Sequence, residues 1–303
     1  MIATCLVMDF NTPSTFAMNK NLLSSNFFDR KATTFYISFN SKSRLLLKCF
    51  LFFIAFSTVS LTVKATTYTV STLSDSGTGS LRQAVLNSNS SSGGDVIVFD
   101  PDLSGTISFG SIITIADDLT INGNGNIILD GQGQYSIFEV SDNSSTLKTI
   151  VIRGLILQNG KSSAGTDYTG TGGYGGISCR ENLSLENVKI TSCTGGLLFG
   201  TKSAAVNTPN LSVTNCIFTS NLSKNALSTS TATSSVNYIG NISINNCVFD
   251  NNTGAVFIGC GTSIAIKNTS FTNNSSTLYG GALYINNQSN TSLTSVLLEN
   301  ITA

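Results

Sequence analysis

The chain has 303 residues, with 16 basic and 16 acidic side chains, so its formal net charge is zero and only 11% of its residues are charged. This sparse, balanced charge excludes an electrostatic nucleic-acid binder, which needs a basic stripe. The absence of histidine excludes Ser-His-Asp and Cys-His catalysis and His-ligated metal sites. A hydrophobic share of 41% indicates a folded chain.

The N-terminal segment has the pattern of an export signal. Its most hydrophobic stretch, residues 49–63, follows several basic residues and ends in Val63-Lys64-Ala65. A basic flank, an apolar core of about fifteen residues and a small-residue exit are typical of a signal peptide, whereas a membrane-spanning helix needs about 20 apolar residues. We predict a signal peptide over 43–65, with cleavage after Ala65 and a secreted or cell-surface location. Residues 1–42 are an N-terminal extension to which we assign no fold.

The mature domain opens with a short strand at 67–70 and one helix at 80–86. Ser80 is a good helix N-cap, and Gln83 three residues later completes a capping-box pattern. The helix has an apolar face, and we expect it to cap one end of the fold, because a solenoid exposes apolar groups at its ends. The next predicted strands are 95–99, 105–109, 112–115, 119–121, 126–129 and 136–140.

A repeat follows and decides the fold class. The units 211–221, 242–252 and 264–274 match position for position, with apolar residues alternating before an Asn and a Phe placed three residues before a second Asn. Looser copies are 150–160, 183–193 and 291–298. The predicted turn positions are 154, 187, 215, 246, 268 and 295. A second element rich in Gly and Ala lies between the units, at 175–177, 195–197, 254–256 and 280–283.

Each repeat therefore predicts a strand, an Asn turn, a second strand, a second Asn turn, a Gly corner and a third strand. The apolar residues alternate with period two inside each strand, so they face a common interior. Short strands, glycine corners and no helical period predict an all-β fold in which successive coils stack as a parallel β-helix, or solenoid, with a short N-terminal capping helix. We place this domain at 66–303.

The asparagines are expected to form two columns along the stack. Asn187, Asn215, Asn246 and Asn268 would lie one above another at the first turn. Asn221, Asn252 and Asn274 would do so at the second. A stacked amide donates to one neighbour and accepts from the other, and Asn tolerates the left-handed conformation that such turns require.

Five cysteines follow the predicted cleavage point, namely Cys179, Cys193, Cys216, Cys247 and Cys260. An odd number at these spacings is not a disulfide framework. Cys216 and Cys247 share one core column, where adjacent coils could bring them within disulfide reach. We expect free buried thiols, because stacked side chains point the same way, and a disulfide between these two remains the alternative.

The sequence also resembles known families. Asp75-Ser-Gly-Thr-Gly-Ser-Leu-Arg-Gln-Ala84, with the strands near 95–100 and 119–123, resembles the CSLREA-type start of bacterial surface β-helix proteins. The Phe-x-x-Asn units beginning at Phe218, Phe249 and Phe271 resemble the repeats of chlamydial polymorphic outer membrane proteins. The resemblance covers 67–303 and implies a right-handed parallel β-helix that acts as an adhesin or autotransporter passenger. Because such proteins carry a C-terminal membrane or sorting domain, we expect this chain to be truncated at its C-terminus.

Candidate catalytic groups are few. The acidic pairs Asp100 with Asp102 and Asp117 with Asp118 lie in turn contexts, where Asp is favoured for backbone reasons, and we predict no catalytic, cofactor or metal site. The Gly-rich stretch 165–176 lacks the Lys and helix of a phosphate loop. It is expected to be a loop on which Tyr168 and Tyr174 are candidates for partner contact.

Three functions stay open. The first is adhesion or surface display, with a host-cell surface, matrix or glycan as partner, no cofactor, no nucleic acid, and an outer-membrane association only through a missing C-terminal region. The second is a carbohydrate-active β-helix, a polysaccharide lyase or hydrolase, with a site in residues 95–180. The third is a structural spacer that holds another domain away from a membrane.

Overall fold

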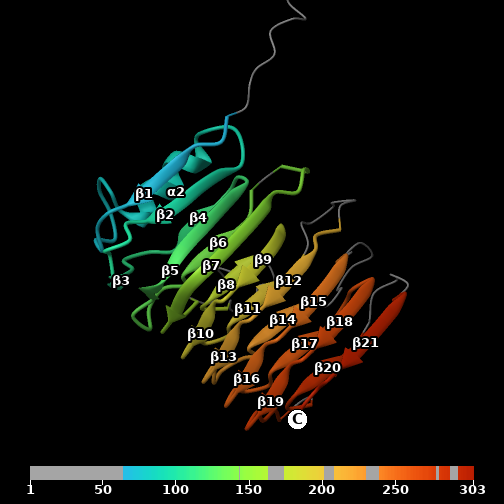
Figure 1. Cartoon of the computed structure of the whole chain (residues 1–303). Helices are drawn as coiled ribbons and strands as arrows, with labels where there is room; N and C mark the ends of the chain where they lie inside the picture. Colours follow the sequence, from blue (N-terminus) through green and yellow to red (C-terminus); the bar gives the residue numbers. More distant parts are fainter. Residues whose placement is uncertain are drawn as a thin grey trace, which may run out of the picture. The chain divides into compact units, whose positions relative to one another are not determined.

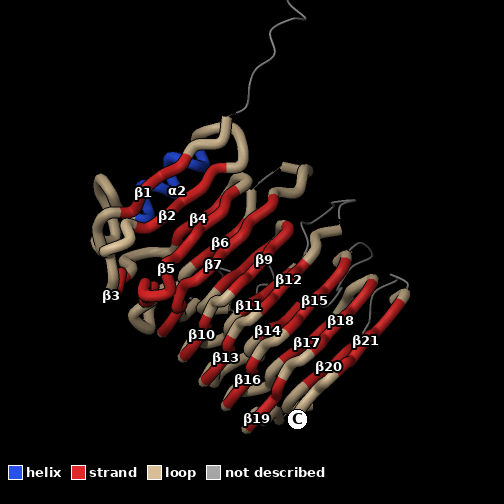
Figure 2. Tube along the Cα trace, in the orientation of Figure 1, coloured by secondary structure: helices blue, strands red, loops and turns tan. Residues whose placement is uncertain are grey.

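A computed structural model gives the fold, and it describes residues 64–142, 144–162, 174–200, 208–229, 239–277, 280–286 and 293–303. These residues belong to one compact unit, Val63–Ala303. The described part is built almost wholly of strands that stack side by side along one axis, with one helix at the N-terminal end (Figures 1 and 2).

The first coil begins at this helical end. Strand β1 (Thr67–Val70) pairs in parallel with β2 (Asp95–Phe99), and helix α2 (Leu81–Asn89) lies between them in the chain. The helix packs against β1, β2 and β4 (Ile113–Ile115), and β2, β3 (Gly105–Ser108) and β4 form the next coil. The helix buries Leu81, Ala84 and Val85, so it covers the apolar end of the stack.

Two long strands continue the stack. Strand β5 (Leu119–Asp130) pairs with β7 (Thr149–Gln158) over its whole length, apart from a register shift between Asn122 and Ile127. Each is followed by a short strand on another face, β6 (Phe138–Val140) after β5 and β8 (Ile177–Cys179) after β7.

Each of the next four coils has three short strands. In chain order they are β9 (Asn182–Glu186), β10 (Lys189–Thr191), β11 (Leu197–Phe199), β12 (Leu211–Thr214), β13 (Ile217–Thr219), β14 (Leu227–Thr229), β15 (Asn241–Asn245), β16 (Val248–Asp250), β17 (Val256–Ile258), β18 (Ser263–Lys267), β19 (Ser270–Thr272) and β20 (Leu283–Ile285). Strand β21 (Ser295–Glu299) starts a further coil.

All strand pairings are parallel and join equivalent strands of neighbouring coils. The first face runs β9, β12, β15, β18, β21, the second runs β10, β13, β16, β19, and the third runs from β4 to β20. The predicted all-β parallel β-helix with an N-terminal helix is confirmed (Figure 1).

The core fills the inside of the coils with columns of matching side chains. Leu211, Ile242 and Ile264 lie in register on the first face. On the second face the ring of Phe249 stacks on Phe218, with centroids 4.7 Å apart, and on Phe271 at 5.2 Å. These side chains are at most 3% exposed, so their burial supplies most of the hydrophobic stabilisation of the coils.

The capping helix is held by the opening motif. The Ser80 side chain accepts a hydrogen bond from the Gln83 backbone N–H, as expected for an N-cap. The reciprocal half of the capping box is not made, because the Gln83 side chain donates to Asn87 instead. Arg82 pairs with Asp75 at 2.6 Å and donates to the carbonyl of Ile112, which ties the helix to the loop before β4.

Three details of the expected strand pattern were wrong. Residues 119–121 and 126–129 belong to the single strand β5, and the turn expected at Gly154 lies inside β7. The last repeat was aligned five residues too early: Ser295 pairs with Ser263 at a strand start, and the turn residue equivalent to Asn268 is Asn300, whose φ is 53°.

Candidate binding groove

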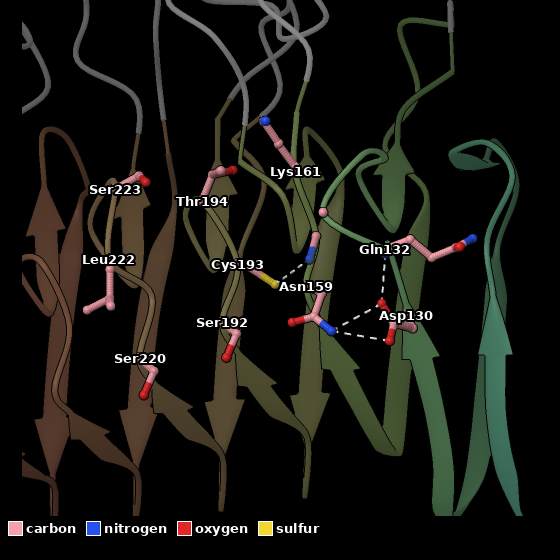
Figure 3. Close-up of a pocket in the computed structure, with 12 residues that line it drawn as sticks. Asp130, Gln132, Asn159, Lys161, Ser192, Cys193, Thr194, Ser220, Leu222 and Ser223 are labelled. Carbon is pink, nitrogen blue, oxygen red and sulfur yellow. Dashed lines mark hydrogen bonds between the residues drawn. The ribbon is translucent and has the colours of Figure 1, made fainter.

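A groove of about 550 Å³ lies along one corner of the β-helix, where the second strand of each coil ends (Figure 3). Its walls come from four successive coils, at the turns that follow β5, β7, β10 and β13. They carry a carboxylate (Asp130), an ammonium group (Lys161), two amides and four hydroxyls, and Leu222 is the large apolar side chain among them. We call this feature the groove.

The corner has the same backbone in each coil. Five residues in equivalent positions have a positive φ between 52° and 57°, namely Asn159, Ser192, Ser220, Asn251 and Asn273. Asparagine is the non-glycine residue that tolerates this conformation best, and two serines adopt it here. The left-handed conformation expected at Asn221, Asn252 and Asn274 therefore lies one residue earlier in each coil.

One residue further on, a ladder of amides fills the inside of the corner. The Nδ2 atom of Asn221 donates to Oδ1 of Asn252 at 3.0 Å, and Asn252 donates in the same way to Asn274 at 2.9 Å. Each of the three Nδ2 atoms also donates to a backbone carbonyl of the neighbouring coil. Asn221 and Asn252 are at most 1% exposed, so the ladder satisfies groups that would be costly to bury unpaired.

The groove lies where this ladder stops. The next coil has Cys193 at the ladder position; its backbone N–H donates to Oδ1 of Asn221. The coil after that has Gly160, whose N–H points at the Cys193 sulfur at 3.3 Å (Figure 3). The smaller residues leave the corner hollow.

Gly160 cannot carry a side chain, because a Cβ there would collide with the carbonyl oxygen of Gly175. A Cβ on Gly175 would in turn strike the carbonyl of Gly160. The two backbones are therefore in close contact. Close backbone approach, rather than a positive φ, explains both glycines.

The Asp130 carboxylate accepts hydrogen bonds from its neighbours in the groove. Its Oδ1 accepts from the Gln132 backbone N–H at 2.7 Å, and its Oδ2 accepts from Nε2 of Gln158 at 2.8 Å. The Asn159 amide lies within hydrogen-bond distance of both oxygens (Figure 3). The carboxylate is therefore occupied by protein donors and is poorly placed to act as a general base.

The two middle coils of the groove carry an exposed lysine without an ion pair and a buried hydroxyl without a hydrogen bond. Lys161 makes no ion pair with any described residue, and Thr194 has a buried hydroxyl that no hydrogen bond satisfies within the described part of the chain. The Thr194 backbone N–H donates to Gly160 at 2.9 Å, which brings Thr194 beside Lys161 on the adjacent coil (Figure 3). Burial raises the pKa of Cys193 to about 12, so this thiol is protonated at neutral pH.

The first turn carries the other predicted column. Asn187, Asn215, Asn246 and Asn268 have φ between 49° and 55° and are exposed. Asn246 donates to Asn215 at 2.8 Å, whereas Asn268 donates to Asn245. The residues stand in register, but their amides do not form a continuous chain.

A third asparagine column was missed. Asn182, Asn210 and Asn241 stand at, or directly before, the start of the first strand of successive coils. The side-chain oxygens of Asn182 and Asn210 accept from the backbone N–H of the next member, at 2.9 and 2.8 Å. The signal was present in the sequence, since these residues recur at the repeat spacing.

The five cysteines in the described part are free and buried. Cys216 and Cys247 are neighbours on adjacent coils, since Val248 donates its backbone N–H to the Cys216 carbonyl at 2.9 Å. A hydrogen bond with Cys247, together with burial, raises the pKa of Cys216. This thiol is therefore protonated and unreactive at neutral pH.

The acidic pairs considered as catalytic candidates hold turns. Asp117 accepts from the Asp118 backbone N–H at 2.8 Å and pairs with Lys148 at 2.5 Å. Asp118 accepts from the first backbone N–H of β7. Asp100 accepts from the Asp102 backbone N–H at 3.0 Å, which is an Asx turn.

The two tyrosines proposed for partner contact have different positions. Tyr168 lies outside the described residues. Tyr174 is 6% exposed, with the Lys224 ammonium 5.6 Å from its ring centroid. Its burial leaves little ring surface for a partner.

No group of three or more Cys, Asp or Glu side chains in the described part is arranged to hold a metal ion. Among the same residues, no helix combines the length and the apolar character needed to span a membrane. No protein-family model and no curated protein matches the chain.

Proposed function

We propose that this chain is a secreted or surface-exposed, non-catalytic β-helix protein that acts in adhesion, like an adhesin or an autotransporter passenger. The main observation behind this proposal is the groove, which exposes polar side chains from four successive coils along one lateral corner. The signal-peptide pattern at 43–65 and the resemblance to bacterial surface β-helix proteins support export to a place where such a surface meets a host cell, matrix or glycan.

The rigidity of the corner favours binding. Backbone hydrogen bonds link its turns to the neighbouring coils, for example from Ser192 to Thr219 and from Ser220 to Asp250. A surface that is already ordered loses little conformational entropy when a partner binds. A stacked fold can therefore present weak contacts that add up along its length.

Binding of the labelled full chain to host cells, matrix proteins and a glycan array tests the proposal. The informative variant fills the groove by Ser192→Arg and Ser220→Arg. The matched control places Ser184→Arg and Ser212→Arg on β9 and β12, away from the groove. We expect binding that the groove variant loses and the control keeps. Binding no stronger than that of a scrambled-surface control would contradict the proposal.

One observation favours a second candidate, a carbohydrate-active enzyme. Asp130 and Lys161 both line the groove and both lie in the 95–180 segment. Incubation with a panel of polyuronates, with and without Ca²⁺, distinguishes the two candidates. New reducing ends or unsaturated products would favour the enzyme, and intact polymer would favour adhesion.

A further inference from the structure

We infer that the groove binds a linear acidic polysaccharide, with Lys161 and Thr194 holding a carboxylate and the hydroxyls further along the groove binding sugar hydroxyls. This inference rests on the proposed function, because it names the ligand class of the same lateral corner.

The first observation is a buried hydroxyl without a hydrogen-bond partner beside an exposed cation without an ion pair. A buried hydroxyl without a partner is unusual, because most buried polar atoms are hydrogen-bonded. The Thr194 hydroxyl is such an atom, and Lys161 on the adjacent coil is a cation without an ion pair among the described residues. A hydroxyl donor beside an ammonium group suits a carboxylate, which accepts charge-assisted hydrogen bonds from both.

The second observation is the shape of the groove. It crosses four coils, and parallel strands are spaced by about 4.8 Å, so it runs for roughly 14 Å. Ser192 and Ser220 occupy equivalent positions on successive coils. Groups repeated at a constant spacing match a polymer with a regular repeat better than a compact small molecule.

The third observation disfavours a peptide. A peptide that adds as a strand needs free backbone groups at a sheet edge. At this corner the backbone N–H groups of Lys161, Ser192 and Thr194 all donate to neighbouring coils. The lining also offers only Leu222 as a large apolar contact, whereas hydroxyls and amides match a ligand rich in hydroxyls.

The charge distribution selects an acidic polymer over a neutral one. The oxygens of Asp130, the carboxylate of the groove, already accept hydrogen bonds from uncharged amide and backbone donors. Lys161 is the cation of the groove and makes no ion pair among the described residues, so it is the group that attracts a ligand carboxylate, and this attraction falls with added salt.

The test measures binding of the full chain to oligogalacturonate by calorimetry. A neutral galactan oligomer, a sulfated galactan and poly-glutamate serve as comparison ligands. We expect oligogalacturonate to bind, the sulfated polymer to bind by the same charge, and the neutral oligomer and poly-glutamate to bind at least tenfold more weakly. Equal binding of the neutral oligomer or of poly-glutamate would overturn the inference.

Three variants distinguish binding in the groove from general electrostatic attraction to the protein surface. Lys161→Gln should weaken oligogalacturonate binding about tenfold, the loss expected for one charge-assisted contact. Lys189→Gln, which removes the same charge from β10 outside the groove, should leave it within about twofold. Thr194→Val should weaken binding about threefold without lowering the thermal midpoint, because no internal hydrogen bond is lost. Equal effects of the two lysine variants would contradict the site.

The outcomes also separate this inference from the proposed function. Adhesion to cells that oligogalacturonate does not compete for would leave the proposed function standing and refute the polysaccharide site. Binding of oligogalacturonate without adhesion would refute the proposed function and keep the site.

Discussion

The coils around β5 and β7 and the coils from β9 to β19 build the same corners with different residues. At the first corner, β7 passes through Gly154, at φ 59°, without interruption, whereas the later coils break into two strands at Asn187, Asn215, Asn246 and Asn268. At the second corner, Gly160 and Cys193 stand where Asn221, Asn252 and Asn274 stand in later coils.

This difference shows that asparagine and glycine are only partly interchangeable at a corner of the β-helix. Both accept a left-handed backbone, but only asparagine supplies an amide that bonds to the coils on either side. Where the ladder runs, the corner is filled and its polar groups are satisfied. Where glycine and cysteine replace it, the corner hollows into the groove.

Breaking the buried ladder should have the largest effect. Asn252→Ala leaves the Asn221 backbone N–H and the Phe218 carbonyl without the partners they have now. We expect a loss of about 3–5 kcal/mol in the free energy of unfolding, from at least two orphaned buried groups plus a cavity. Denaturant unfolding measures it. The exposed Asn246→Gly, which keeps a residue suited to a positive φ, is the control and should cost under about 1 kcal/mol; equal losses would contradict a special role for the buried ladder.

Adding a side chain to the hollow corner should have the next largest effect. Gly160→Ala forces the backbone away from Gly175, and overpacking of this kind costs about 1–3 kcal/mol. Gly133→Ala is the matched control, because Gly133 has φ 65° and open space around it; its cost is the backbone strain alone, about 1 kcal/mol. Thermal unfolding compares the two, and a smaller loss for Gly160→Ala would contradict the close approach.

Charge pairs between coils should matter less. Lys267 pairs with Glu299 of the next coil at 3.0 Å, and both side chains are at least 40% exposed. Lys267→Gln should therefore lower the stability by no more than about 1 kcal/mol, and high salt should remove the difference. A large loss that persists in high salt would show a role in packing instead.

The smallest expected effect is on acid stability. Hydrogen bonds from Thr272 and Asn273 lower the pKa of Asp250 below its ordinary 3.8. A folded pKa below the unfolded value gives stability that is present above pH 3.8 and lost as the pH falls through the folded pKa. Asp250→Asn should therefore slightly reduce the difference between the denaturant midpoint of unfolding at neutral pH and the midpoint at acidic pH. A larger difference in the variant would contradict the lowered pKa of Asp250.

The repeat predicted the architecture because its signals are local. Alternating apolar residues and left-handed asparagines recur in each coil, so the strands and inward columns could be placed from residues such as Val213 and Phe218. The long β5 and β7 could not, because Gly123 and Gly154 look like turn residues and only cross-coil pairing shows that the strands continue through them. The register of β21 was missed because Asn300 lies five residues beyond the position expected from the shorter spacing.

The groove could not be predicted from the sequence. It arises from the absence of asparagine at the positions of Gly160 and Cys193, and a missing side chain leaves no motif. The unsatisfied Thr194 hydroxyl depends on the arrangement of three neighbouring coils. The turn roles expected for Asp100 and Asp117, by contrast, follow from their immediate neighbours.

A crystal structure of the full chain, at a resolution that places side-chain amides, tests the stacked register most directly. We expect Asn221, Asn252 and Asn274 to lie in one buried file, with each Nδ2 about 3 Å from the next Oδ1. Finding these three amides in solvent, or on strands that are not neighbours, would contradict the fold and the origin assigned to the groove.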